Sequence, residues 1–285
     1  MPPTLSQGKC CLWMGGLRFI EMRGREALEY EWRAPVAQKE EELKTYRIRP
    51  LLLTIMEIDQ GILTYRYNYG VKIKAPVVAW YIEGADAHIL VDTGADAALA
   101  TSYRGFPAEE VMNFDKALGT LGLKPSDIDI VVQTHLHWDH CANTQKCTRA
   151  RVIVQEDEIQ FALAPHPISG LSYKRELLAG VNFRVIKGEY EVAPGIDLIP
   201  APGHSPGSMA VAINTEKGKA VITGFCCVPD NFNPPEKIRA YSPVIPPGTH
   251  TDLMAGYTSM LKIKGIADIL LCQHDMAVAQ RKVIP

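Results

Sequence analysis

The chain has 285 residues, of which 47% are hydrophobic and 22% charged, and its formal net charge is −2. This length and apolar content predict one large folded domain with a substantial core. A pI near 6.5 and the lack of any block of like charge argue against nucleic acid and membrane as partners, so we expect a small-molecule substrate. We find neither a long apolar run nor a secretory signal pattern, and therefore expect a cytoplasmic protein.

The cysteines do not have the spacing of a disulfide framework. Their number is odd and two adjacent pairs occur, so we interpret most of them as reduced thiols, in keeping with a cytoplasmic location. The seven cysteines are Cys10, Cys11, Cys141, Cys147, Cys226, Cys227 and Cys272.

Residues 1–45 differ in composition from the rest of the chain. Charged side chains crowd positions 21–44, helical periodicity is weak there, and Pro35 interrupts it. Two interpretations stay open: an arm used for dimerisation or as a lid, or an extension without a catalytic role. We therefore assign 1–45 as an N-terminal extension of unknown role, and 46–285 as the domain that carries the chemistry.

Strands are predicted after residue 46, and they lead to a sharp turn. The expected strands are rich in β-branched and aromatic side chains and are separated by turn-forming residues. Asp92-Thr93-Gly94 follows the third strand, where a small aspartate and a glycine permit a tight turn. These three strands span 51–58, 77–82 and 88–91.

A helix and a further strand are predicted next. Apolar residues at Val111, Phe114, Leu118 and Leu121 have the spacing of a helix that packs on a sheet, and we assign this helix to 107–121. The apolar run that follows predicts a strand over 128–133. The order of strand, helix and strand is typical of α/β proteins.

The residues directly behind that strand include three histidines and an aspartate: His135, His137, Asp139 and His140. Histidine is the commonest metal ligand in proteins, and carboxylate is a natural partner. Alternation places the side chains of residues 135 and 137 on one side of an extended segment. The plain alternative, a surface loop rich in histidine, would crowd several ionisable groups for no gain. The pattern therefore predicts a metal site.

The second half of the chain again ends strands in potential ligands. One predicted strand breaks at a turn that presents His204, and another leads to His274. Residues 164–180 are too rich in proline and glycine for regular structure. The other expected strands are 151–154, 183–186, 191–192, 196–199, 209–213, 220–223 and 269–272, and the expected helices are 156–163 and 251–261.

The motif His-x-His-x-Asp-His after a strand resembles the signature of the metallo-β-lactamase-fold hydrolases, which include glyoxalase II and the N-acyl homoserine lactonases. Three further motifs stand in the order that this family requires: Val91-Asp92-Thr93-Gly94, Pro202-Gly203-His204-Ser205-Pro206-Gly207, and Gln273-His274-Asp275. The resemblance extends from about residue 46 to the C-terminus. It implies an αββα sandwich of two mixed β-sheets flanked by helices.

The resemblance also implies two metal sites. His135, His137 and His204 match the first site, a set of three imidazoles that leaves a coordination position for water. Asp92 matches a residue that supports the metal-binding loop by hydrogen bonding and is not a ligand. We expect one or two Zn²⁺ ions, with Mn²⁺ and Fe²⁺ as the other candidates. The second site is matched by Asp139, His140 and His274.

One position departs from the family pattern. The family has an aspartate that bridges both metals after a strand, but here Gly224 is followed by Phe225, and phenylalanine cannot bind a metal. Three arrangements stay open: Cys226 or Cys227 as a thiolate ligand, two ions without a bridge, or a single ion. Buried cysteines that only fill space are the plain alternative for the two thiols.

A second departure concerns the substrate carbonyl. The tyrosine that polarises this carbonyl in the lactonases would fall on Val228, which has no hydroxyl. Tyr173 and Tyr241 are the candidates for this role in the substrate pocket. Tyr173 lies within 164–180, a segment that either helps to wall the pocket, as in the lactonases, or forms an ordinary surface loop.

The resemblance implies a hydrolase in which metal-bound hydroxide opens a lactone or a related ester or amide, as in the N-acyl homoserine lactonases. Asp139 would orient the hydroxide or carry its proton to the leaving group. Two alternatives stay open: a thioesterase like glyoxalase II, and a metal-binding protein that lost catalysis along with the bridging aspartate. The substrate and the oligomeric state, a homodimer included, are left open by the sequence.

Overall fold

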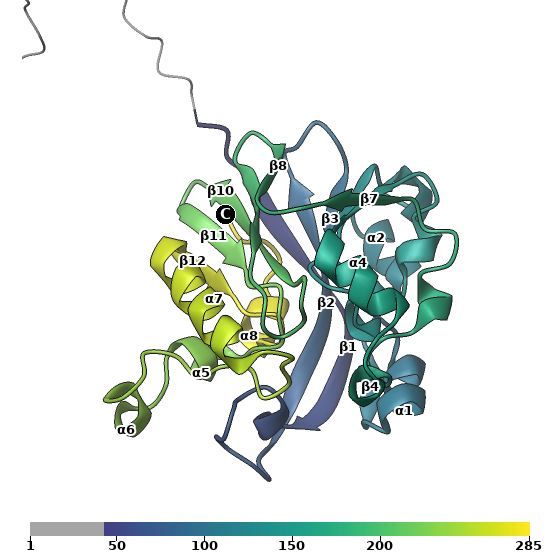
Figure 1. The fold of residues 1–285 in the computed structure, drawn as a ribbon. Helices are drawn as coiled ribbons and strands as arrows, with labels where there is room; N and C mark the ends of the chain where they lie inside the picture. The colour runs from purple at the N-terminus through teal and green to yellow at the C-terminus, as the bar shows by residue number, and fades with distance from the viewer. Residues whose placement is uncertain (1–42) are drawn as a thin grey trace, which may run out of the picture. The chain divides into compact units, whose positions relative to one another are not determined.

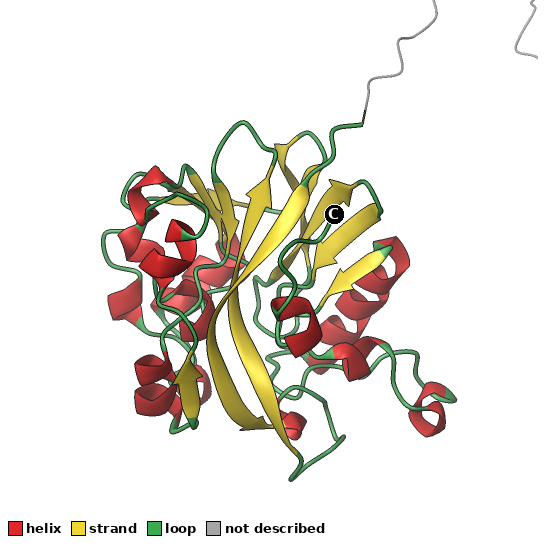
Figure 2. Ribbon diagram, turned by 180° about the vertical axis from the view of Figure 1, so that it is seen from behind, coloured by secondary structure: helices red, strands yellow, loops and turns green. Residues whose placement is uncertain are grey.

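The computed structural model describes residues 43–285, so the predicted N-terminal extension lies outside it up to residue 42. The described strands form two β-sheets, one of seven strands and one of five. Helices cover the outer face of each sheet, which confirms the predicted αββα sandwich (Figures 1 and 2). In the described part of the chain, no helix has the length and apolar content needed to cross a membrane.

The seven-stranded sheet is antiparallel on one side and parallel on the other. Its order is β4 (Ala108–Glu110), β1 (Arg47–Asp59), β2 (Lys72–Glu83), β3 (Ile89–Val91), β5 (Ile130–Val132), β6 (Arg151–Gln155) and β7 (Phe183–Ile186). The pairs from β4 to β3 are antiparallel, and the pairs from β3 to β7 are parallel. Parallel pairs need crossover connections, and helices supply most of these here.

The five-stranded sheet is mostly antiparallel. Its order is β12 (Ile269–Leu271), β11 (Gly218–Ile222), β10 (Met209–Thr215), β9 (Ile196–Pro200) and β8 (Tyr190–Ala193). Only the pair of β11 and β12 is parallel among these strands. The predicted hairpin of β10 and β11 is confirmed, with Thr215 opposite Gly218 at its turn.

The main core lies between the sheets, and smaller cores lie under the helices. Val78 and Trp80 of β2 face the main core, whereas Ala79 between them packs on the helix side. This alternation follows from the two-residue period of a strand with both faces buried. The main core joins apolar side chains of both sheets, including Trp80, Val91, Val132, Leu198, Val211, Ile222 and Leu271.

The helices differ from the prediction mainly before β5. Residues 107–121 form β4 and a short helix rather than one long helix, because Ala108–Glu110 pairs with β1 as the edge strand of the sheet and the side chain of Asn113 caps the helix that follows. The helices are α1 (Ala97–Arg104), α2 (Phe114–Gly119), α3 (Trp138–Cys141), α4 (Glu156–Leu163), α5 (Pro229–Phe232), α6 (Glu236–Arg239), α7 (Leu253–Ile266) and α8 (Met276–Ala279). Short 3-10 turns occupy Gln60–Ile62, Pro125–Asp127, Thr144–Lys146, Pro167–Ser169 and Arg175–Leu177.

Candidate metal centre

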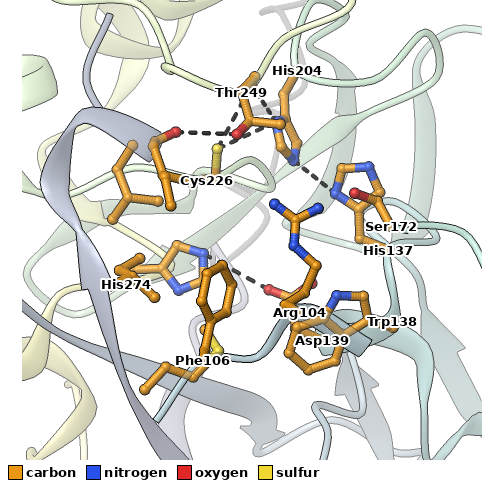
Figure 3. Close-up of a pocket in the computed structure, with 14 residues that line it drawn as sticks. Arg104, Phe106, His137, Trp138, Asp139, Ser172, His204, Cys226, Thr249 and His274 are labelled. Atoms are coloured by element: carbon orange, nitrogen blue, oxygen red, sulfur yellow. Dashed lines mark hydrogen bonds and ion pairs between the residues drawn. The ribbon is translucent and has the colours of Figure 1, made fainter. Parts of the chain in front are cut away.

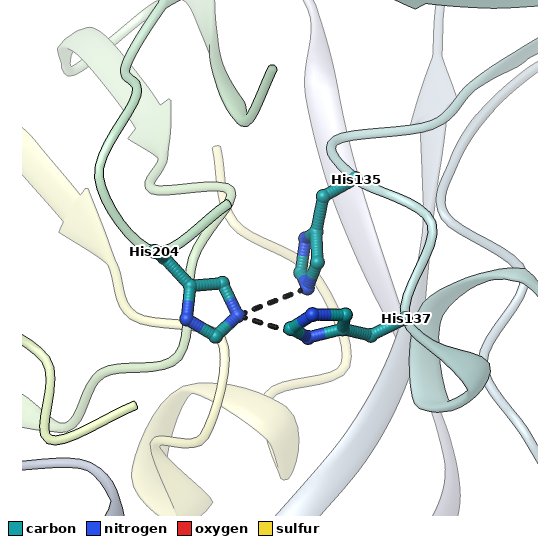
Figure 4. A group of neighbouring side chains, drawn as sticks. All are labelled: His135, His137 and His204. Carbon is teal, nitrogen blue, oxygen red and sulfur yellow. Dashed lines mark hydrogen bonds between the residues drawn. The ribbon is translucent and has the colours of Figure 1, made fainter. Parts of the chain in front are cut away.

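The loop after β5 presents alternate side chains to different surroundings. His135 and His137 project toward His204 (Figure 4), whereas Leu136 between them is buried in an apolar cluster. The prediction that alternation places both imidazoles on one side is therefore confirmed. Helix α3 starts directly after His137, so Asp139 lies in its first turn.

Three imidazole nitrogens converge in the first ligand group, formed by His135, His137 and His204. Nε2 of His204 lies 3.2 Å from Nε2 of His135 and 3.1 Å from Nδ1 of His137 (Figure 4). All three residues are buried. Bonds of about 2.0–2.1 Å to a tetrahedral zinc ion would hold two nitrogens roughly 3.3 Å apart, so the spacing fits a bound ion.

Hydrogen bonds on the far side of two rings determine which nitrogen is free. Nδ1 of His204 lies 2.7 Å from the carbonyl oxygen of Thr249, and because a carbonyl only accepts, this nitrogen carries the hydrogen. Nδ1 of His135 lies 3.1 Å from Oγ1 of Thr134, whose hydroxyl lies 2.8 Å from the carboxylate of Asp92. Each Nε2 thus keeps a lone pair, and two lone pairs this close favour a cation between them.

Burial keeps these imidazoles uncharged. It lowers the pKa of His204 to about 4, and it lowers the pKa values of His135 and His137 well below their usual range. Neutral imidazole is the form that binds a metal ion. The first group is therefore ready for a metal without the loss of a proton.

Asp139, His140 and His274 form the second ligand group, in which one ligand atom of each residue lies within 4.8 Å of the others. Oδ2 of Asp139 lies 3.4 Å from Nε2 of His140 and 4.0 Å from Nε2 of His274. Nδ1 of His274 donates to the carbonyl oxygen of Pro76 at 2.9 Å, which leaves its Nε2 free. A carboxylate with two imidazoles suits a second divalent ion.

The second group holds charges that the first does not. Burial opposes a charged imidazole at His140, but the carboxylates of Asp139 and Asp92 outweigh it and raise the pKa of His140 to about 10. Burial also opposes the charge of Asp139, but His140 beside it holds the pKa of this carboxylate well below its usual range. In the metal-free chain, an ion must therefore displace a proton from His140.

Asp92 lies behind both ligand groups and belongs to neither. Its φ is 56°, a left-handed conformation that aspartate adopts more readily than most residues. Its carboxylate accepts from the backbone N–H of Thr134 at 2.8 Å and from Nδ1 of His140 at 2.7 Å. These contacts match the supporting role that the resemblance implied.

Gln273 extends this network, and the sequence analysis did not assign it a function. Its Nε2 donates to Asp92 at 3.0 Å, and its Oε1 accepts from Nε1 of Trp80 at 3.0 Å. Gln273 and Asp92 are 181 residues apart in the chain, so no local pattern could pair them. The only local signal was its position directly before His274.

Phe225 stands where the family pattern has an aspartate, and its side chain does not join either ligand group. It is buried in the apolar cluster between the five-stranded sheet and α7, and its ring stacks on Phe232 with centroids 6.2 Å apart. Gly224 before it has a φ of 72°, and a Cβ at Gly224 would overlap the carbonyl group of Met209. This tight turn sends the side chain at 225 into the core.

The two cysteines after Phe225 have different surroundings. Sγ of Cys226 lies 3.3 Å from Nδ1 of His204, the nitrogen that faces Thr249 and not the one that faces the other imidazoles. Sγ of Cys227 lies 3.0 Å from Oγ1 of Thr223. Among residues 43–285, neither sulfur belongs to a group of converging ligand atoms.

A small pocket of about 60 Å³ opens over both ligand groups (Figure 3). Ligand residues form its floor, and the walls are mostly apolar. The floor includes His137, Asp139, His204 and His274, and the apolar wall includes Met56, Ile58, Ile62, Leu63, Phe106 and Trp138.

Arg104 also lines this pocket, and the sequence analysis missed it. It is the last residue of α1, a helix that was not predicted although Asp96 caps its start and Gly105 its end. Its guanidinium lies 5.3 Å from the centre of the Phe106 ring and points into the pocket (Figure 3). The capping signals at both ends were visible in the sequence, but the direction of the side chain was not.

The two tyrosines predicted for the pocket do not line it. Tyr241 is 93% exposed and follows α6. Tyr173 is buried, and its hydroxyl donates to Glu158 at 2.9 Å. In the described part of the chain, the pocket therefore has no tyrosine hydroxyl to polarise a carbonyl.

An αββα sandwich that gathers imidazole and carboxylate ligands under one pocket has the architecture of a metallo-hydrolase. A comparison with protein-family models matches residues 74–255 to the description "Metallo-beta-lactamase superfamily". The match spans well over half of the chain, and the chain therefore belongs to the metallo-β-lactamase superfamily.

Individual relatives agree with this assignment. The chain is similar to the N-acyl homoserine lactonase AiiA of Bacillus thuringiensis subsp. kurstaki, with 31% identity over 177 residues, which cover 58% of this chain and 69% of the relative. A crystal structure of an AiiA variant from B. thuringiensis, with N-decanoyl-L-homoserine bound at the active site, has a TM-score of 0.68 and 24% identity, covering 82% of this chain and 95% of that one. AidC, described as a dizinc quorum-quenching lactonase, has a TM-score of 0.59 and 17% identity over 85% of this chain and 94% of that one.

Proposed function

We propose that this chain is a metal-dependent hydrolase that opens the ring of an N-acylated lactone. The observation that carries the proposal is the convergence of free nitrogens in the first ligand group, where Nε2 of His204 lies 3.1–3.2 Å from its two partners beneath a mostly apolar pocket. Relatives named N-acyl homoserine lactonases support the choice of substrate class.

Zinc is the metal we propose for the first group, because imidazole suits a borderline-soft ion and the spacing fits tetrahedral bonds. His135, His137 and His204 would hold it, and a second divalent ion would be held by the group around Asp139 without a bridging side chain from Phe225. When bound, such ions supply the Lewis acidity that polarises a carbonyl and acidifies a water molecule. Mn²⁺ and Fe²⁺ are the other metals to be tested.

Asp139 is the residue we propose for proton transfer. Its carboxylate stays ionised because His140 lowers its pKa, and its Oδ2 faces the two imidazoles of the second group. Oδ1 would accept a proton from the attacking water and return it to the alkoxide oxygen that leaves when the ring opens. The side chain is 14% exposed, which gives it access from the pocket.

Arg104 is the residue we propose for the substrate carbonyl, in place of the tyrosine that the pocket lacks. None of the ion pairs among residues 43–285 gives Arg104 a carboxylate partner, so its donors are available. A guanidinium can donate to the amide or lactone carbonyl oxygen. The apolar wall beside it, with Phe106 and Leu63, would receive the acyl chain.

The test is ring opening by the purified, zinc-loaded chain across N-acyl lactones of increasing chain length, with an unsubstituted lactone and an acyl thioester for comparison. We expect metal-dependent opening that is faster for acylated lactones. Faster cleavage of the thioester would favour the glyoxalase II-like alternative. A chain that retains its metal and cleaves none of these compounds would instead be a metal-binding protein without this activity.

A further inference from the structure

Glu158, on α4, is a buried carboxylate that neither ligand group uses. Its side chain is fully buried, and in the part of the chain that the structure describes no lysine, arginine or histidine is paired with it. Burial raises the pKa of Glu158, and hydrogen bonds to its carboxylate oppose this rise. A buried acid without a counter-charge calls for a specific structural role.

Four donors surround the two oxygens of this carboxylate. Oε1 accepts from the backbone N–H of Leu136 at 2.8 Å and from the hydroxyl of Tyr173 at 2.9 Å. Oε2 accepts from the hydroxyl of Ser205 at 2.6 Å and from the backbone N–H of Gly207 at 3.1 Å. A carboxylate can accept all four at once, whereas an amide of the same size cannot.

Three of these donors, all except the hydroxyl of Tyr173, belong to the two loops that carry the first ligand group. Leu136 lies between His135 and His137 in the loop after β5, and Ser205 directly follows His204 in the loop after β9. The two loops come from different sheets, and Glu158 joins them from a third element, α4.

Gly207 gives independent evidence for this arrangement. A Cβ at this position would overlap the backbone of Glu158, so any other residue would push the His204 loop away from α4. The close approach lets the backbone N–H of Gly207 reach Oε2 directly. Tyr173, the remaining donor, also packs its ring edge-on against His137, with centroids 4.7 Å apart.

We propose that Glu158 is a positioning residue that clamps the His135–His137 loop to the His204 loop and thereby sets the spacing of the first ligand group. This inference rests on the ligand assignment of the proposed function. The second ligand group has other supports, namely Asp92 behind His140 and the carbonyl of Pro76 behind His274. Glu158 therefore sets the spacing of the ligand atoms in the first group and does not affect the spacing in the second.

The test is titration of the full-length, metal-free chain with Zn²⁺ in competition with a chelator, and with Co²⁺ to follow the visible spectrum of the bound ion. In Glu158→Gln the side-chain amide must turn its NH₂ toward two donors, so one loop is released. The binding step that His204→Ala removes identifies the first site. We expect Glu158→Gln to weaken this step by roughly 10–100-fold, to change its cobalt spectrum, and to leave the other step unchanged.

Glu156→Gln is the matched control on the same helix, because the carboxylate of Glu156 pairs with Lys187 at the surface and, among residues 43–285, forms no side-chain hydrogen bond with either loop. It should leave both binding steps and the cobalt spectrum unchanged. Equal weakening of both steps by Glu158→Gln, or no weakening at all, would overturn the clamp. A wild-type chain that takes up no ion would overturn the ligand assignment itself, and the clamp with it.

If Glu158→Gln does not fold, variants that each remove one hydrogen-bond donor to Glu158 can test the proposal instead. Ser205→Ala removes a contact from the His204 loop to Glu158 and should weaken only the first step, several-fold. Tyr173→Phe keeps the ring against His137 and both loop contacts, so it should leave both steps unchanged.

Ser259→Ala is the control for the loop itself, because its hydroxyl donates to Pro202 at 2.7 Å without involving Glu158. Equal effects of Ser205→Ala and Ser259→Ala would contradict the clamp.

Discussion

The two ligand groups share one pocket, but only the second contains a histidine, His140, whose pKa is raised so that it carries a charge. In the first group, burial lowers the pKa values of all three imidazoles, and a carbonyl and a hydroxyl orient two of the rings. In the second group, two carboxylates flank His140 and raise its pKa to about 10. Neutral donors bind an ion without losing a proton, whereas a charged imidazole must first give up its proton.

Similar residue types can therefore form two metal sites that differ in whether a proton must leave before the ion binds. The first group already has the geometry of a zinc site, because neutral imidazole nitrogens face one another at distances of 3.1–3.2 Å. The second group contains an ion pair between Asp139 and His140, whose Oδ2 and Nε2 atoms lie 3.4 Å apart. We therefore expect the first group to fill before the second at neutral pH.

The largest effect should come from removing a ligand of the first group. His204→Ala deletes one of three imidazoles, so we expect the first ion to bind on the order of 10³-fold more weakly and turnover to be lost. Metal content by mass spectrometry, together with the lactone assay, measures both. His166→Ala, at an exposed histidine, is the control. A His204→Ala chain with full metal content and activity would contradict the assignment of the first group.

The next prediction separates the two groups by pH. Because the raised pKa keeps His140 protonated below about 10, the affinity of the second ion should rise by up to tenfold for each unit of pH. Between pH 6 and pH 8 this amounts to roughly 100-fold, while the first ion should change little because its imidazoles are already neutral. Chelator competition at the two pH values measures both constants. The same pH dependence for both ions would remove the distinction between the groups.

A smaller effect is expected above the two groups, at Arg104. Arg104→Met keeps most of the apolar stem but removes the donors, so we expect kcat/KM for an N-acyl lactone to fall by roughly 10-fold or more. Neither ion should be lost, because Arg104 is not part of a ligand group. Steady-state kinetics with metal analysis provide the readout, and Arg149→Met, at an exposed position, is the control. Unchanged kinetics would exclude Arg104 from carbonyl recognition.

The cysteines after Phe225 test whether either group has a further ligand. Neither sulfur converges with the ligand atoms, so the double variant Cys226→Ser and Cys227→Ser should keep its full metal count. Both side chains are buried, and two hydroxyls in their place should lower stability by about 1–3 kcal/mol. Metal stoichiometry and thermal unfolding measure the two effects. Loss of about one ion per chain would show that a thiolate is a ligand.

The smallest effect is expected from the N-terminal extension. Both ligand groups and the pocket lie within residues 43–285, so deletion of residues 1–40 should change neither the metal count nor the activity per site. Sedimentation of the truncated chain reports whether those residues hold a homodimer together. A truncated chain that does not fold would show that the extension belongs to the domain.

Local sequence patterns predicted most of the fold, and the exceptions have identifiable causes. Helix α4 was predicted with its observed bounds, Glu156–Leu163, and β7 likewise, because their periodicity and flanking residues agree with the tertiary environment. The helix predicted for 107–121 was wrong in its first part. There Ala108–Glu110 forms the edge strand beside β1, and tertiary pairing outweighs local preference.

The sequence by itself predicted the family, the layer order and the histidines and aspartate that the structure brings together in two groups, because each of these residues stands in a short motif at the end of a strand. Only the tertiary structure decided what surrounds those ligands. Packing of the two sheets brings Thr249 behind His204, turns Phe225 into the core, and aims Arg104 at the pocket. Glu158 illustrates the reason: its four donors come from three separate segments, and such contacts form only when distant parts of the chain pack together.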